Sequence, residues 1–164
     1  MQMRISYARS APGVFDAMES LDNYLEGSAI ERPLRLLIQM RASQINGCAY
    51  CLDMHSKDLR AIGETEQRIY SLDAWRECPY YTERERAALE WTEAVTLVAE
   101  THIPDATYDA VRPFFDEREL ADLTLAVATI NAWNRLSIAA RLTPGSYQPT
   151  AQPTAQPAAQ PAAV

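Results

Sequence analysis

Residues 44–55 read QINGCAYCLDMH and bring two cysteines and a histidine into one short segment. Cys48 and Cys51 are three residues apart, and His55 follows Cys51 by four residues. At about 100° per residue, the three side chains fall within about 60° of one face of a helix. A helical segment therefore lets the two sulfurs form a disulfide with little backbone movement, and it places the imidazole one turn away.

We expect Asn46 or Gly47 to cap this helix, so that both cysteines lie in its first turns. Unpaired backbone amides and the helix dipole favour a thiolate there. A thiol with a pKa of about 8.5 is about 3% thiolate at pH 7, whereas a pKa of about 7 makes it about half thiolate. The placement therefore predicts a reactive cysteine, with His55 as proton acceptor or donor. Asp53 and Asp58 lie off the cysteine face and are expected to be solvated.

The residues alone leave three interpretations of this segment open. A CxxC pair on a helix is typical of thiol–disulfide redox catalysis. Zinc binding is the second interpretation, because two thiols and an imidazole supply three of the usual four ligands. His102 and Cys78 are the other candidates for the fourth ligand, and neither lies at motif spacing. The third interpretation is structural, with two small buried residues and a histidine on the surface.

Helical spacing continues on both sides of the segment, and no stretch has the alternation of a half-buried strand. Gly27 and Gly63 are placed to end helices, and Thr82 and Asp116 each precede a glutamate by three residues, as in a capping box. The sequence therefore predicts an all-α fold. The expected helices cover residues 14–25, 33–45, 48–63, 65–72, 82–100 and 104–111, and a further helix begins at Asp116.

Residues 123–134 carry no charged side chain. A helix that is apolar all round is typically buried, so we expect this one at the centre of the domain or at a subunit interface. Asn131, Asn134 and Arg135 lie at its end and need hydrogen-bond partners if they are buried. We expect these partners on neighbouring helices, and the lining of a substrate cavity is the alternative.

Length and composition predict one domain with an appendage. The chain has 164 residues, of which 48% are hydrophobic and 23% charged, as is usual for a globular domain. We expect the domain to cover residues 1–145. Residues 146–164 contain four tandem tetrapeptides rich in Gln, Pro and Ala, with no charge and no large apolar side chain except Tyr147 ahead of them. This composition predicts a disordered or polyproline II tail.

Charge and apolar patterning argue against several partners. The chain has 22 acidic and 15 basic residues and a net charge of -7, which disfavours binding to nucleic acid. No apolar run reaches the roughly 18–20 residues of a membrane span. Residues 1–10 lack the apolar region of a secretion signal, so we expect a cytoplasmic protein. Three cysteines are too few for a disulfide scaffold.

Three stretches give the sequence a specific likeness to a known family. They lie within residues 33–63, which contain RASQINGCAYCLDMHSKD (41–58), and at YTERERAAL (81–89) and INAWNR (130–135). Through these stretches the chain resembles the alkylhydroperoxidase D-like (AhpD-like) branch of the carboxymuconolactone decarboxylase superfamily over most of residues 13–145. The resemblance implies an all-α AhpD-like domain that assembles as a homo-oligomer, as a trimer or a hexamer.

The resemblance also implies a function and a role for each site residue. Members of that branch are thiol-dependent peroxidases in which the second motif cysteine attacks a hydroperoxide and the first then resolves the sulfenic acid as a disulfide. Carried over to this chain, Cys51 attacks, Cys48 resolves and His55 belongs to a proton relay. The implied partners are a hydroperoxide and a thiol or dithiol reductant, such as a thioredoxin-like or lipoyl donor. The implied cycle needs no metal and no cofactor.

Two positions of the proton relay depart from the family pattern. The family has a glutamate where this chain has Leu36, and the best-known branch has a histidine where this chain has Tyr50. We therefore expect slower peroxidase turnover unless Glu19, Glu26 or Glu31 approaches the site in the fold.

Two other functions stay open at this point. One is a carboxymuconolactone decarboxylase-type enzyme, which acts on a small lactone without relying on a CxxC pair. The other is a non-enzymatic redox-responsive protein that has kept the motif without efficient turnover.

Overall fold

A computed structural model of the chain describes residues 2–149, and within that range all regular elements are helical. Residues 150–164, which make up most of the predicted tail and its repeats, lie outside the described residues. No helix in the described range is long and apolar enough to span a membrane. The helices are α1 (Tyr7–Ser10), α2 (Gly13–Glu26), α3 (Arg32–Asn46), α4 (Ala49–Ala61), α5 (Glu66–Ser71), the short 3-10 helix η1 (Leu72–Ala74), α6 (Glu83–Thr96), α7 (Val98–Thr101), α8 (Asp105–Val111) and α9 (Glu117–Ala140).

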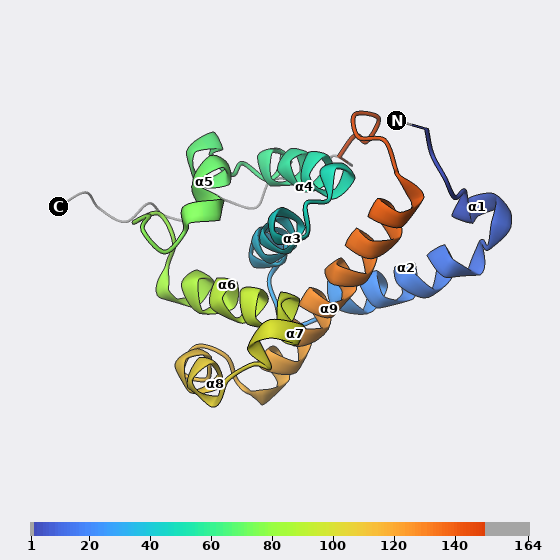
Figure 1. The fold of residues 1–164 in the computed structure, drawn as a ribbon. Coiled ribbons are helices and arrows are strands. Elements are labelled where there is room, and N and C mark those ends of the chain that lie inside the picture. The colour runs from blue at the N-terminus through green and yellow to red at the C-terminus, as the bar shows by residue number, and fades with distance from the viewer. Residues whose placement is uncertain (1, 150–164) are drawn as a thin grey trace.

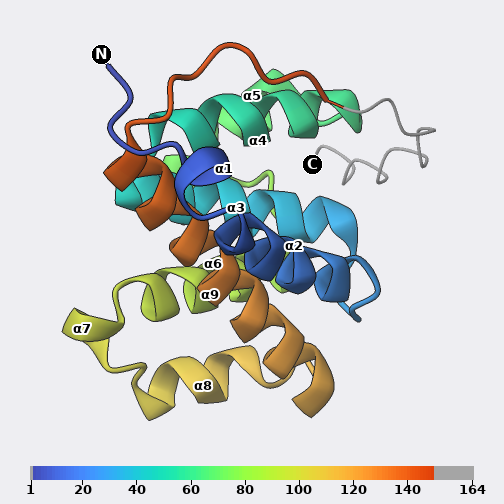
Figure 2. The ribbon, with the colours of Figure 1, turned by 90° about the vertical axis from the view of Figure 1, so that its right-hand side faces the viewer.

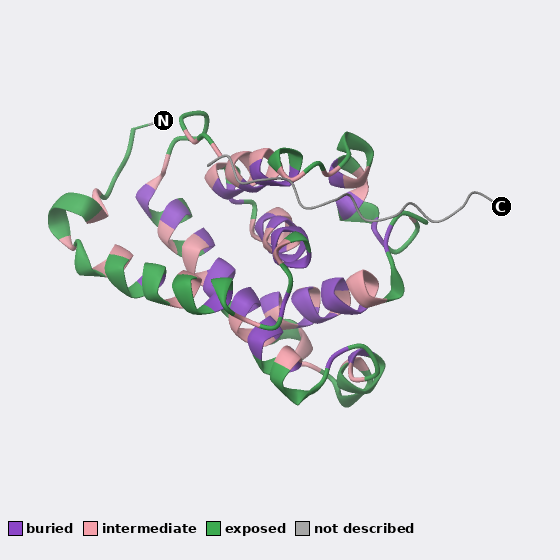
Figure 3. Cartoon of the chain, turned by 180° about the vertical axis from the view of Figure 1, so that it is seen from behind, coloured by how far each residue is buried: buried purple, intermediate pink, exposed green. Residues whose placement is uncertain are grey.

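Helix α3 lies at the centre of the structure, seen almost end-on in Figure 1 with α4 above it, α6 below it and α9 beside it. Its apolar residues contribute to two separate cores. Leu34 and Ile38 pack in a cluster with side chains of α6 and α9. Leu36 and Met40 pack in a second cluster that includes Leu59 of α4. Because both sides of α3 are covered, most of its residues are buried (Figure 3).

Local sequence signals account for most of the helix ends. The structure confirms both capping boxes, at Thr82 before α6 and at Asp116 before α9. The expected helix over residues 82–100 is interrupted, because Leu97 leaves helical geometry with φ -97° and ψ 30°. The hydroxyl of Thr101 donates to the carbonyl of Ala94 at 2.8 Å and so binds a carbonyl close to the interruption.

Helix α9 is the longest helix of the described chain and packs against α2, α3, α4 and α6. Leu123, Val127 and Ile130 are almost completely buried within this single chain. The predicted central position of residues 123–134 is therefore confirmed, although Ala128 faces solvent. The helix continues beyond the charge-free stretch, to Ala140.

The chain that follows α9 runs along α4 and is held to it by side chains (Figure 2). Lys57 Nζ donates to the carbonyl oxygen of Tyr147 at 3.0 Å, and the amide of Gly145 donates to Asp53 at 3.0 Å. The hydroxyl of Tyr147 donates to Asp58 Oδ1 at 2.7 Å. Residues 145–147 therefore form a strap over one side of α4.

This strap overturns the expectation that Asp58 is solvated. Asp58 is 8% exposed, because Tyr147 lies over it. Burial raises the pKa of the Asp58 carboxyl, and the hydrogen bond from Tyr147 partly offsets that rise. Helical phase placed Asp58 off the cysteine face correctly, but it contained no information about a residue 89 positions away in the sequence.

The variant Tyr147→Phe tests the strap. It removes the donor to a buried carboxylate, which we expect to cost about 1–2 kcal/mol of the free energy of unfolding. The loss is measured by thermal and urea denaturation at pH 7. A chain that ends at Pro149 is the control, and we expect it to melt together with the full chain. Equal melting of Tyr147→Phe and the unchanged protein would show that the strap adds nothing to stability.

Candidate redox site on helix α4

The turn between α3 and α4 is built on Gly47. Its φ of 65° lies in the left-handed region, which glycine adopts at little cost. The amide of Gly47 donates to the carbonyl of Gln44 at 3.2 Å, and the amide of Cys48 donates to that of Ser43 at 3.1 Å. These two bonds form a Schellman motif, which ends α3 and lets α4 begin at Ala49.

Cys48 is the N-cap of α4, which corrects the expected cap at Asn46 or Gly47. The reason is that Gly47 is needed in left-handed geometry to end α3, so the next residue starts the new helix. Cys48 has extended backbone angles, φ -83° and ψ 95°, and its Sγ accepts a hydrogen bond from the amide of Cys51 at 3.4 Å. The Cys48 sulfur is thus the N-cap acceptor, which in most helices is a serine or aspartate oxygen.

A disulfide joins Cys48 to Cys51, with their Cα atoms 5.3 Å apart. The residue spacing therefore brings the two sulfurs together, as the helical face predicted. Both cysteines are 1% exposed, so the disulfide is covered by protein in this single chain. The pair is close enough for redox chemistry but closed to bulk solvent.

His55 lies one turn beyond Cys51 on α4 and is 3% exposed. The structure therefore excludes the surface position considered for it. Neither Nδ1 nor Nε2 has a hydrogen-bond partner among the described residues. Burial lowers the pKa of the imidazole to about 4. His55 is consequently neutral at pH 7, with a proton on one ring nitrogen and a free lone pair on the other.

None of the three candidate glutamates stands in for the glutamate of the family pattern. Leu36 is 6% exposed and packs in the apolar cluster around Leu59. Two of the three candidate glutamates make ion pairs elsewhere: Glu26 with Arg35 at 3.0 Å, and Glu31 with another arginine. The third, Glu19, is exposed on α2. The imidazole of His55 is therefore the one titratable group that the predicted relay retains.

A polar network lies directly beneath the turn, and the sequence showed only part of it. Asn46 Nδ2 donates to Asn131 Oδ1 at 3.0 Å and to Asn134 Oδ1 at 2.9 Å. Asn134 Nδ2 donates to Ser43 Oγ at 3.0 Å, and the exposed Arg135 donates to the side chain and backbone of Asn131. The predicted hydrogen bonds between helices are confirmed for Asn131 and Asn134. Asn46 and Ser43 were missed, because nothing in their local sequence indicates contact with α9.

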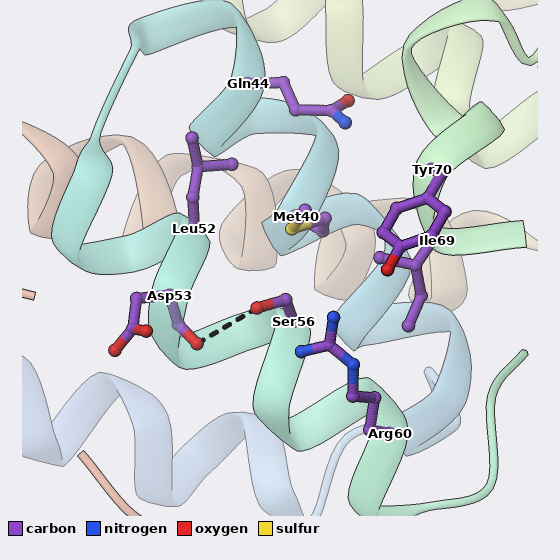
Figure 4. Close-up of a pocket in the computed structure, with 8 residues that line it drawn as sticks. All are labelled: Met40, Gln44, Leu52, Asp53, Ser56, Arg60, Ile69 and Tyr70. Atoms are coloured by element: carbon purple, nitrogen blue, oxygen red, sulfur yellow. Dashed lines mark hydrogen bonds between the residues drawn. The ribbon is translucent and has the colours of Figure 1, made fainter. Parts of the chain in front are cut away.

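A surface depression of about 430 Å³ lies on another side of α4, between α3 and α5 (Figure 4). The sulfurs and His55 are not among its lining residues, so it is not an entrance to the disulfide. The lining residues are Met40, Gln44, Leu52, Asp53, Ser56, Arg60, Ile69 and Tyr70. Within residues 2–149, no group of three or more His, Cys, Asp or Glu side chains is arranged to hold a metal ion.

The chain is similar in sequence to a known protein family and to an individual bacterial protein. The sequence pattern of the carboxymuconolactone decarboxylase family matches residues 12–94, which include α3, α4 and the motif. An uncharacterized protein of Bacillus subtilis, YdfG, is 48% identical over 139 residues, which cover 85% of this chain and 95% of YdfG.

Two solved structures are similar to nearly the whole fold. A protein of unknown function from Agrobacterium tumefaciens, proposed to be an antioxidant defence protein AhpD, is 44% identical, with a TM-score of 0.83. The match covers 91% of this chain and 99% of that one. An uncharacterized peroxidase-related protein from Silicibacter is 25% identical, with a TM-score of 0.72, over 80% of this chain and 70% of that chain.

The burial of His55 predicts a pH dependence of stability. The pKa of the imidazole falls from 6.5 in the unfolded chain to about 4 in the folded protein, so below pH 6.5 the unfolded state binds a proton that the folded state does not. The free energy of unfolding therefore decreases as the pH falls from 6.5 to about 4, by roughly 3 kcal/mol.

Urea denaturation of the oxidised protein and of His55→Gln across this range checks the prediction. Carboxylates contribute equally to both proteins, so the difference between their unfolding free energies isolates the histidine. A difference that stays constant from pH 7 to pH 4 would show that the imidazole is not held neutral by burial.

Proposed function

The chain belongs to the carboxymuconolactone decarboxylase family, and from that premise we propose that it is a thiol-dependent peroxidase with a Cys48–Cys51 redox pair. The observation that carries the proposal is the bonded pair of sulfurs at the start of α4, with a buried neutral imidazole one turn away. Similarity to a protein proposed to be the antioxidant defence protein AhpD and to a peroxidase-related protein supports it.

In the oxidative half of the cycle, Cys51 reacts with the hydroperoxide. His55 takes the proton of the Cys51 thiol, and the thiolate attacks the terminal peroxide oxygen. The O–O bond breaks, the alkoxide leaves as the alcohol with that proton, and Cys51 becomes a sulfenic acid. Cys48 then attacks the Cys51 sulfur, water leaves, and the disulfide forms. One hydroperoxide is reduced by two electrons, and two thiols are oxidised.

In the reductive half, a dithiol donor such as a thioredoxin-like or lipoyl group restores the pair by two successive thiol–disulfide exchanges. Because both cysteines are 1% exposed, each exchange requires the turn or its covering residues to open locally. Leu36 and Tyr50 also leave the relay without its other proton-transferring groups. Both features favour slow turnover.

Peroxide assays on cysteine variants test the proposal. We expect Cys51→Ser to abolish peroxide consumption, since the attacking sulfur is gone. Cys48→Ser should consume about one equivalent of peroxide and leave a sulfenic acid at Cys51 that a dimedone-type reagent labels. His55→Gln should lower the rate by a factor of about 10² or more.

Cys78→Ser is the matched control, because Cys78 is the free cysteine of the described chain and lies far from the pair in sequence. It should keep the full rate. Sulfenic acid at Cys48 in Cys51→Ser would reverse the two roles, and undiminished turnover in Cys51→Ser would refute the mechanism.

The same assays distinguish the two other functions. A carboxymuconolactone decarboxylase-type enzyme would turn over a small lactone at a rate that Cys51→Ser leaves unchanged. A redox-responsive protein without turnover would form and lose the disulfide reversibly but consume no peroxide catalytically with any dithiol donor. The intact cysteine pair favours the peroxidase over the first, and the proton-accepting His55 favours it over the second.

The proposal includes a homo-oligomer, a trimer or a hexamer, located in the cytoplasm. Apolar side chains are exposed where the N-terminal segment meets the end of α9. Met3 is 47% and Ile138 46% exposed, and the amide of Arg4 donates to the carbonyl of Ala140 at 2.8 Å. This surface supports self-association. Sedimentation velocity of the full chain at micromolar concentration should show a trimer or larger, and a monomer would contradict the assembly.

A further inference from the structure

We propose that Asn134 of α9, together with Asn46, is a positioning residue that makes Cys48 the more acidic thiol of the reduced pair. This inference deepens the proposed function and rests on the dithiol–disulfide cycle. It assigns a role to a buried polar network that the peroxidase chemistry itself does not use.

The network reaches Cys48 through two hydrogen bonds and one residue. Asn134, which is 0% exposed, donates from Nδ2 to the hydroxyl of Ser43 at 3.0 Å. The backbone carbonyl of the same serine accepts the amide of Cys48 at 3.1 Å. The side chain of Asn134 is therefore hydrogen-bonded to Ser43, and Ser43 is hydrogen-bonded to the backbone of Cys48.

A second branch fixes the other side of the turn. Asn46, the last residue of α3, donates from Nδ2 to Asn134 Oδ1 and Asn131 Oδ1. Asn131 is itself held by donation to Thr96 Oγ1 and to a backbone carbonyl of α9. Ser43 and Asn46, at the end of α3, are thus both hydrogen-bonded to α9. Their partners on α9, Asn131 and Asn134, are three residues apart.

The geometry held in this way gives the Cys48 sulfur its hydrogen bond. The amide of Cys51 is one of the first four N–H groups of α4, which have no partner within the helix. It reaches Cys48 Sγ because the Cys48 backbone is extended at φ -83° and ψ 95°. In the reduced protein this bond and the positive end of α4 stabilise a thiolate on Cys48. Within the described residues, no hydrogen bond reaches the Cys51 sulfur.

An acidic Cys48 directs both halves of the cycle. As a thiolate it is ready to attack the sulfenic sulfur of Cys51. When a donor reopens the disulfide, the donor's thiolate bonds to Cys51, and the S–S electron pair leaves with Cys48, the better leaving group. Cys51 therefore exchanges with external partners in both halves, whereas Cys48 bonds only to Cys51.

The free-energy cost of burying these amides also indicates that the network does more than pack the helices together. A buried amide is unfavourable unless it is hydrogen-bonded, and the side chain of Asn134 is completely buried. Leu or Ala at this position would build the same helix without that requirement. Three asparagines converge at the turn before Cys48, the point of the fold where a shift changes the chemistry.

The test titrates Cys48 alone. In a full-length chain carrying Cys51→Ser and Cys78→Ser, residue 51 keeps its backbone N–H, and the thiolate is followed by absorbance at 240 nm and by alkylation rate against pH. We expect a pKa of about 7 in this background. Adding Asn134→Ala or Asn46→Ala should raise the pKa of Cys48 toward about 8.5, which lowers the thiolate fraction at pH 7 roughly fifteen-fold.

Thr129→Val is the matched control. Thr129 is a buried polar residue on the same helix, 2% exposed, and its hydroxyl has no hydrogen-bond partner in the described part of the chain. It should leave the pKa of Cys48 unchanged. A merely structural network would lower the melting temperature of the asparagine variants without moving that pKa, which would overturn the proposal. An equal pKa rise in Thr129→Val would overturn it as well.

Circular dichroism establishes which variants are folded. If Asn134→Ala is not, the half-buried Asn46→Ala decides between the two outcomes. The titration uses neither peroxide nor reductant, so its result is independent of the peroxide assays. Failure of the peroxidase proposal and failure of the positioning proposal are therefore separately visible.

Discussion

The hydrogen bond from the Cys48 amide to the Ser43 carbonyl is the constraint on which the site depends. It ends the central helix α3 and turns the chain, and it makes Cys48 the N-cap of α4. Only a left-handed residue at position 47 allows this bond, and glycine is the residue that adopts that geometry without strain. The position of the Cys48–Cys51 disulfide is thus a consequence of how one helix ends and the next one begins.

Because α3 is covered on both sides by apolar clusters, its end is a rigid support for the turn. The cluster on one side joins it to α6 and α9, and the cluster on the other side joins it to α4 and α5. Helix α9 then adds directional contacts through Asn131 and Asn134, which apolar packing cannot supply. Packing fixes the distance between the helices, and the amides fix their register at the cysteines.

Burial has opposite consequences for His55 and Asp58, the two buried titratable side chains of α4 outside the disulfide. His55 is buried with no hydrogen-bond partner among residues 2–149, and its imidazole is neutral at pH 7. Asp58 is buried under Tyr147, which donates a hydrogen bond to its carboxyl group and ties the strap to α4. Burial therefore leaves the His55 imidazole uncharged, whereas the buried Asp58 carboxyl group attaches the strap to α4. Leu36 packs in the apolar cluster around Leu59, so in the proposed cycle the histidine would act without the carboxylate of the family pattern.

The sequence by itself determined the all-α fold, the two capping boxes, the glycine stops and the meeting of Cys48 with Cys51, because these depend on residues within about four positions of one another. Only the tertiary structure decided that His55 is buried, that Asp58 is covered by Tyr147 and that Asn46 meets α9. The contacts of Asp58 and Asn46 join residues more than eighty positions apart. Helical periodicity says which face a side chain occupies, but burial depends on what packs against that face, and that is set by the path of the whole chain.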